Sequence, residues 1–186
     1  MSWDTTKPTD EIGYPKTNIQ NRECTMKKLL IIGLLLCLMS GCQKNTGTFA
    51  QGDKNLSSVF ADINEQIADG AFSIPLLKDT ALSEREVETL YQLDMTKIES
   101  CMVRTAAVQA QLGEIALFKV KKENEGEVKK AIASRKEDLK KQWGAYVPEA
   151  ADLLYQAKEG RIGQYYYFVL GSDSEKVVNY MQKMDA

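Results

Sequence analysis

An apolar run at residues 29–39 most strongly limits which part of this chain can form a globular domain. Two lysines precede the run, and Ser-Gly-Cys follows it, ending at Cys42. The run has 11 residues, whereas an α-helix needs about 20 apolar residues to cross a bilayer. A basic start with a short apolar core is typical of a secretory signal peptide. We therefore expect the folded domain to come only from residues after this run.

The five residues LMSGC at 38–42 resemble the lipobox of bacterial lipoproteins, although Met39 stands where that pattern usually has leucine. The resemblance implies cleavage of a signal peptide at 26–41 and attachment of lipid to Cys42. Two acyl chains, such as palmitate, hold a protein stably on a membrane. We therefore expect a lipid anchor on the outer face of the cell membrane. The alternatives for the run are a buried core helix and a plain membrane anchor.

The rest of the chain divides into three parts around this signal. Residues 1–25 are polar and precede a complete signal, so we interpret them as a mis-assigned start before Met26 or as an extension. Residues 42–55 combine the lipidated cysteine with polar residues and two glycines, a composition that predicts a flexible tether. Residues 56–186 are long enough for a single domain.

Composition excludes several kinds of chemistry. The chain has no histidine, which removes the commonest general base and metal ligand. Its net charge is −2, so nothing favours nucleic-acid binding. If the chain is cleaved before Cys42 and that thiol is lipidated, Cys101 is the one free thiol left and no internal disulfide can form. We expect no enzyme activity, cofactor or metal.

Periodicity and capping patterns predict a mixture of helices and strands. Apolar spacing, aromatic or β-branched runs and capping pairs mark the elements. The capping pairs are Ser83 with Glu86, Asn124 with Glu127, and Ser172 with Glu175. The expected helices cover about 56–70, 83–92, 124–146, 148–160 and 172–184, and the expected strands cover 98–106, 114–121 and 164–170. The fold class is therefore α+β, with a small antiparallel or mixed three-stranded sheet covered by helices in a two-layer sandwich.

Arg135 is the residue whose position most needs an explanation. In a helix that includes Val128, Arg135 lies about 20° from it, in the middle of the apolar stripe that also holds Ile132, Leu139 and Tyr146. A buried arginine keeps its proton and requires a partner or a route to water. The interpretations are an anchor paired with an acid or with carbonyls at the end of an element, a side chain that extends its charged group to water, and a ligand-facing cation. The nearest acids to the expected strands are Asp94, Glu99 and Glu114.

Other conspicuous residues have simpler structural explanations. Alternate glutamates in a helix do not share a face, interrupted lysines indicate a solvated helix face, a run of aromatics in a strand alternates between faces, and an isolated cysteine is commonly a small buried residue. The residues concerned are Glu84, Glu86 and Glu88; Lys129, Lys130, Lys136, Lys140 and Lys141; Tyr165, Tyr166, Tyr167 and Phe168; and Cys101.

Several short motifs in order resemble an uncharacterised family, the domain of unknown function 4358, found in lipoproteins of clostridia-type Gram-positive bacteria. The motifs are EIALFKVK at 114–121, Arg135, YVP at 146–148 and GQYY at 163–166. The resemblance extends from about Ile98 to the C-terminus. It implies an envelope location and an architecture, and it implies no activity.

These observations favour a membrane-anchored, extracytoplasmic, non-catalytic binding or scaffolding module of the cell envelope. Arg135 and Tyr146 are its candidate binding residues. The expected partners are the membrane, through lipid on Cys42, and other envelope proteins or the cell wall. The alternatives are a chaperone or assembly factor for exported proteins and an envelope enzyme that works without histidine.

Overall fold

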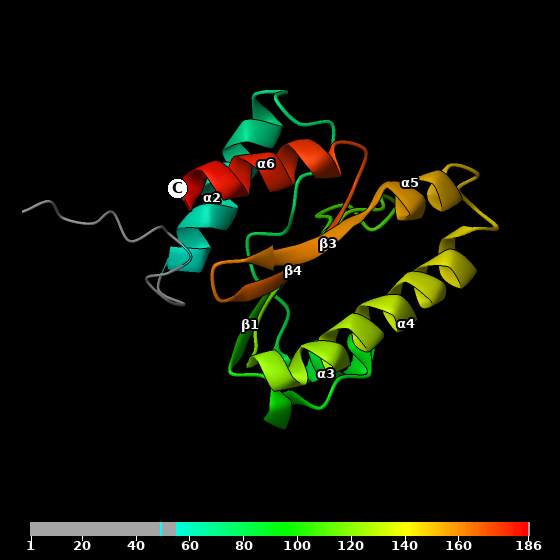
Figure 1. The fold of residues 1–186 in the computed structure, drawn as a ribbon. Helices are drawn as coiled ribbons and strands as arrows, with labels where there is room; N and C mark the ends of the chain where they lie inside the picture. Colours follow the sequence, from blue (N-terminus) through cyan, green and yellow to red (C-terminus); the bar gives the residue numbers. More distant parts are fainter. Residues whose placement is uncertain (1–48, 50–54, 186) are drawn as a thin grey trace, which may run out of the picture. The chain divides into compact units, whose positions relative to one another are not determined.

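The computed structural model describes Phe49 and residues 55–185 of the chain (Figure 1). The predicted extension 1–25, the signal peptide 26–41 and Cys42 lie outside these residues, as does the predicted tether except for Phe49 and Asn55. The elements in chain order are α2 (Leu56–Ala68), α3 (Glu84–Tyr91), the 3-10 helix η4 (Met95–Lys97), β1 (Ser100–Thr105), β2 (Glu114–Lys119), the 3-10 helix η5 (Lys122–Asn124), α4 (Glu125–Trp143), α5 (Ala150–Gln156), β3 (Lys158–Ile162), β4 (Tyr165–Leu170) and α6 (Ser174–Met184).

The strands form one sheet in the order β1-β2-β4-β3, and every neighbouring pair is antiparallel. The α+β class is therefore confirmed, but the sheet has four strands where three were predicted. In the registers, Cys101 lies opposite Phe118, and Leu117 lies opposite Tyr167. Residues 76–82 hydrogen-bond along the free edge of β1, where the amide of Lys78 donates to the carbonyl of Thr105 at 2.9 Å.

The missed strand is β3, whose sequence KEGRI has little β-propensity. Gly160 was expected to end a helix, but α5 ends at Gln156 and Gly160 lies in β3 opposite Tyr167. A Cβ at position 160 would lie 2.7 Å from the Tyr167 hydroxyl oxygen. Glycine is therefore used here to let an aromatic ring cross a neighbouring strand.

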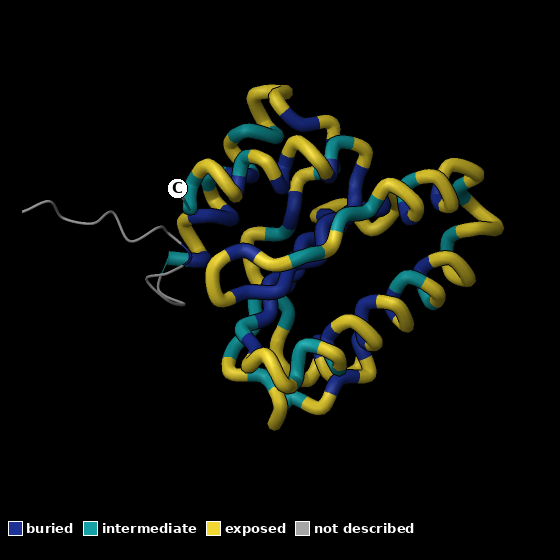
Figure 2. The backbone as a smooth tube through the Cα atoms, viewed as in Figure 1, coloured by how far each residue is buried: buried dark blue, intermediate teal, exposed yellow. Residues whose placement is uncertain are grey.

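Helices cover both faces of the sheet, so the predicted two layers are three. Figure 1 shows α2 and α6 on one side of the strands and α3 and α4 on the other. Strand residues alternate between the two faces: Tyr165 and Tyr167 pack with α2 and α6, whereas Tyr166 and Phe168 pack with α3, α4 and α5. All four are buried, and in Figure 2 β4 is accordingly dark blue.

Phe49 belongs to the core on the α2 and α6 face. Its side chain is fully buried, and its ring lies edge-on to Tyr165 with the centroids 6.1 Å apart. Its amide donates a hydrogen bond of 3.2 Å to Oδ1 of Asp185. The packed part of the chain thus includes a residue that lies before Leu56, inside the segment predicted as a tether.

Of the three capping pairs expected from the sequence, that of α3 is confirmed. The Ser83 hydroxyl accepts from the Glu86 amide, and the Glu86 carboxylate accepts from the Ser83 amide at 2.7 Å. At α6 the expected cap Ser172 is replaced by Asp173, whose carboxylate accepts from the Ser73 amide at 2.7 Å and caps no amide of its own helix.

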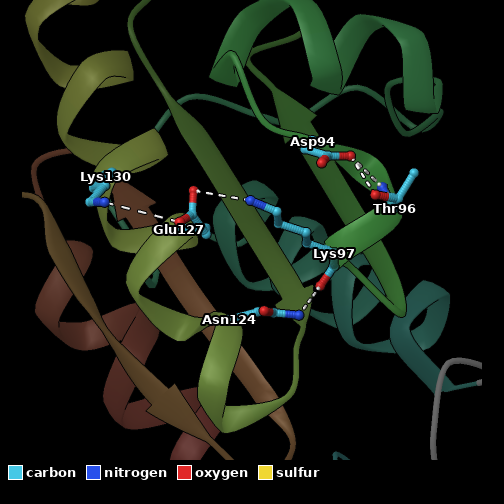
Figure 3. Close-up of polar contacts among 6 residues, drawn as sticks. All are labelled: Asp94, Thr96, Lys97, Asn124, Glu127 and Lys130. Atoms are coloured by element: carbon cyan, nitrogen blue, oxygen red, sulfur yellow. Dashed lines mark hydrogen bonds and ion pairs between the residues drawn. The ribbon is translucent and has the colours of Figure 1, made fainter.

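At the start of α4 the expected pair of Asn124 and Glu127 makes other contacts (Figure 3). Asn124 donates its side-chain amide to the carbonyl of Lys97 at 3.2 Å. Glu127 forms ion pairs with Lys97 at 3.7 Å and Lys130 at 4.0 Å. These groups therefore connect α4 to η4, and the prediction of a local cap was wrong because a distant segment supplies the partners.

Candidate functional site

A buried ion pair joins α4 to the start of β2. Arg135 and Glu114 are 7% and 2% exposed. The guanidinium of Arg135 donates from Nη2 to Oε2 of Glu114 at 2.7 Å and from Nε to the same oxygen at 3.2 Å. An anchor paired with an acid was one of the interpretations of Arg135, and Glu114 is the partner among the three acids named from the sequence.

Tyr91, at the end of α3, is a third member of this cluster. Its hydroxyl donates to Oε1 of Glu114, and the ring packs edge-on against Phe118. Burial, followed by the nearby Glu114 charge, raises the pKa of Tyr91 well above its usual value. Tyr91 could not be predicted from the sequence, because no local pattern connects the end of α3 to the start of β2.

The charge of Arg135 is stabilised in place. Burial on its own lowers the pKa of this guanidinium, but Glu114, with smaller contributions from Tyr91 and Asp138, outweighs burial and the net pKa lies above the usual value. An arginine held this way remains a permanent cation with a fixed orientation. The N–H donors of Arg135 that do not bond to Glu114 are therefore held in a fixed orientation.

The cluster borders a cavity between α4 and the loop that follows β1. The cavity has a volume of about 320 Å³, and a second hollow of about 430 Å³ shares Gln109, Gln142 and Trp143 with it. We call the two together the Arg135 groove. Its lining residues are Lys78, Thr105, Ala106, Val108, Gln109, Ala110, Gln111, Leu112, Gly113, Glu114, Arg135, Leu139, Gln142, Trp143, Tyr146 and Val147.

One atom of Arg135 distinguishes this groove from a packing defect. Within the described part of the chain, Nε and Nη2 of Arg135 bond to Glu114, whereas Nη1 makes no hydrogen bond. Arg135 lines the groove. Among the described residues, Nη1 is not one of the fully buried polar atoms without a partner, so it is accessible to solvent. Two N–H donors therefore remain for a bound group.

The groove walls combine donors, amides and apolar surface. Lys78, Glu114 and Arg135 are the charged lining residues and together carry one net positive charge. Three glutamine amides, of Gln109, Gln111 and Gln142, can each donate and accept. Such a mixture of apolar wall and a few polar groups is usual for ligand pockets of 300–1,000 Å³.

The two candidate binding residues occupy different parts of this groove. Arg135 is nine-tenths buried at its inner end, whereas Tyr146 is 84% exposed and borders the outer hollow. Cys42, the predicted lipidation site, is outside the described residues. Lys78 and the three glutamines were missed, since polar residues in loops carry no periodic signal.

The other conspicuous residues behave as structural elements. Lysines of α4 form ion pairs, such as Lys129 with Glu125 at 2.9 Å and Lys136 with Glu159 at 3.8 Å. Cys101 is half-buried, more accessible than expected, and packs beside the α3 and α4 core. Among residues 49 and 55–185, no group of three or more acidic or thiol side chains could hold a metal ion. Within the same residues, no helix is both long and apolar enough to cross a membrane.

Comparison with protein families gives a match over residues 73–171 to the family described as Domain of unknown function (DUF4358). The chain belongs to this family. No curated protein and no solved structure matches it significantly.

The DUF4358 match covers α3 to β4 and therefore the whole Arg135 groove. It begins before Ile98, where the resemblance in the sequence starts, and it ends before α6. The DUF4358 domain of this chain thus consists of the four strands with the helices α3, α4 and α5. Phe49, α2 and α6, which cover the opposite face, lie outside the match.

Proposed function

We propose that this protein is a non-catalytic binding module of the cell envelope, anchored outside the membrane by lipid on Cys42, with the Arg135 groove as its ligand site. The observation that carries the proposal is the free Nη1 of Arg135 at the inner end of the groove. A cation that is nine-tenths buried and has unused donors is costly unless water or a ligand completes it.

A ligand screen tests the binding role. Thermal melts of the full-length chain in detergent would be recorded with amino acids, short peptides, sugar acids and amino sugars. A ligand at one hundred times its Kd stabilises the native state by about 2.7 kcal/mol. We expect at least one class to raise the melting temperature.

The control for this screen is Gln142→Trp, which fills the groove from its rim with a large side chain. Any stabilisation by a groove ligand should disappear in this variant. The binding role is wrong if no class stabilises the wild type, or if every stabilising ligand acts equally on the filled variant.

The anchoring part of the proposal depends on the basic residues, the apolar run and Ser-Gly-Cys ending at Cys42. Cells fed an alkyne-bearing fatty acid should label the wild type and not Cys42→Ala. Cys101→Ala is the matched control, and it should label like the wild type. Equal labelling of wild type and Cys42→Ala would overturn the anchor while leaving the binding role to be judged by its own test.

A further inference from the structure

The inner end of the Arg135 groove is rich in donors. Nη1 of Arg135 has no partner among the described residues, and Lys78, which lines the same cavity, forms no ion pair among them. The Arg135 charge is balanced by Glu114, so Lys78 is the lining cation without a carboxylate in the cavity wall, and the exposed Glu86 outside the wall lies within electrostatic reach of it. Two donors with one net positive charge favour an anionic acceptor such as a carboxylate.

The rim of the groove offers groups that match peptide bonds. A glutamine amide has one carbonyl and one NH₂, so it can pair with a backbone N–H and C=O at once. Gln111 belongs to the inner cavity, whereas Gln109 and Gln142 border both hollows. Amides therefore follow the groove from the donor-rich end outward.

The walls supply apolar contact beside these amides. Leu112, Leu139 and Trp143 line the inner cavity, and Trp143 continues into the outer hollow with Tyr146 and Val147. Tyr146 is 84% exposed and Val108 is 54% exposed. Large apolar side chains are costly in water, and short side chains of an extended peptide would cover them.

We propose that the Arg135 groove binds the carboxyl-terminal end of a short peptide, with the terminal carboxylate at Nη1 of Arg135 and near Lys78. The last peptide bonds then pair with the glutamine amides, and the preceding residue lies against Trp143. The inference rests on the proposed function, because it names the ligand class of that same groove. A compact sugar acid would satisfy the donors, but it would leave the outer amides and the Tyr146 end without contact.

Calorimetric titration of the full-length chain in detergent tests this inference with three probes. The first is N-acetyl-trialanine with a free carboxylate, the second is the same peptide as its terminal amide, and the third is glucuronic acid. A charge-assisted hydrogen bond discriminates by about tenfold or more. We expect the free acid to bind at least tenfold more tightly than the amide, and glucuronic acid to bind more weakly than both.

Two groove variants and one control locate the carboxylate. Lys78→Gln should weaken binding of the free acid several-fold and leave binding of the amide unchanged. Arg135→Lys keeps a cation for Glu114 but lacks Nη1, and it should remove the preference for the free acid. Lys176→Gln, on α6 at the other face of the sheet, should bind like the wild type.

Each other outcome overturns the inference. Equal binding of acid and amide shows that no carboxylate is recognised, and tight binding of glucuronic acid alone assigns the groove to a sugar acid. If neither peptide binds but another class stabilises the wild type and not Gln142→Trp, the ligand class is wrong and the binding role stands. The binding result for Arg135→Lys counts only if a urea melt shows that this variant is folded. If the variant is unfolded, the result for Lys78→Gln tests the inference alone.

Discussion

Two arginines are buried on opposite faces of the same sheet, and the protein accommodates them differently. Arg104 of β1, on the α2 and α6 face, is 8% exposed, and Arg135 of α4, on the other face, is 7% exposed. Arg135 has Glu114 at 2.7 Å. Arg104 has the Phe60 ring at 5.0 Å, and its buried Nε has no hydrogen-bond partner among the described residues.

The difference appears in the electrostatics of the two side chains. Burial lowers the pKa of Arg104, and Asp79 opposes this only in part. For Arg135 burial also lowers the pKa, but Glu114, helped by Tyr91 and Asp138, outweighs it and the net pKa is raised. A paired cation makes its partner depend on it, whereas a cation over an aromatic ring leaves no counter-charge behind when it is removed. The same substitution should therefore destabilise the Arg135 face far more than the Arg104 face.

The largest effect should come from Arg135→Met. The substitution keeps the volume of the side chain but leaves the Glu114 charge buried without its partner, which should cost about 3–5 kcal/mol. Urea melts of the full-length chain measure this loss. The double variant with Glu114→Gln, which removes the charge but keeps an acceptor for the Tyr91 hydroxyl, should recover most of the stability. A loss below about 1 kcal/mol for the single variant would show that Glu114 does not depend on Arg135.

Phe49→Ala tests whether the α2 and α6 face depends on a residue from the predicted tether. Deleting a fully buried phenylalanine should destabilise the chain by about 3 kcal/mol, the lower end for such changes. Tyr155→Ala is the control, because Tyr155 is 91% exposed and its loss should change stability by less than about 0.5 kcal/mol. Equal effects of the two variants would mean that the domain begins after Phe49.

Alkaline pH should weaken the Arg135 face through Tyr91, whose pKa is raised by burial and by Glu114. The unfolded chain ionises this tyrosine near pH 10, whereas the folded chain holds it neutral. The stabilisation is therefore complete below about pH 10 and is lost as the pH rises toward the folded pKa. Urea midpoints across this range should fall.

Tyr91→Phe is the control for the alkaline measurement, because it removes this titration and keeps the ring. The variant should retain only the shallower decline due to Tyr166 and Tyr167, whose pKa values burial also raises. Identical pH profiles for the wild type and the variant would exclude Tyr91 as the titrating group.

The smallest effect should come from Arg104→Met, the matched substitution on the other face. Removing a buried cation that has no carboxylate at hydrogen-bond distance leaves no group unpaired, so stability should stay within about 1 kcal/mol or rise. A loss as large as that of Arg135→Met would mean that Arg104 has an essential partner and that the two faces are alike.

The parts of the fold that depend on neighbours in the chain could be predicted. The capping box of Ser83 and Glu86, the aromatic strand β4 and the buried position of Arg135 follow from spacings of a few residues. The same reasoning failed where a distant residue changed the local outcome. Asn124 bonds to Lys97 instead of capping α4. Position 160 has no room for a side chain, because Tyr167 of the next strand lies against it.

The candidate site shows the same division. Helical periodicity alone placed Arg135 in an apolar stripe, and the chemistry of the guanidinium required either a partner or access to water. The groove beside it could not be predicted, because Lys78, Gln109 and Gln142 come from three segments that no period connects. Loops carry such residues and have little regular pattern.

The sequence by itself determined most of the helices, three of the four strands, the α+β class and the need of one buried cation for a partner or for water, because these depend on backbone periodicity and on the fixed charge of arginine. The tertiary structure decided which of three acids pairs with Arg135, that helices cover both faces of the sheet, and that Phe49 joins the core. Those choices depend on contacts between residues far apart in the chain, and the free energy of such contacts is set by packing rather than by local sequence.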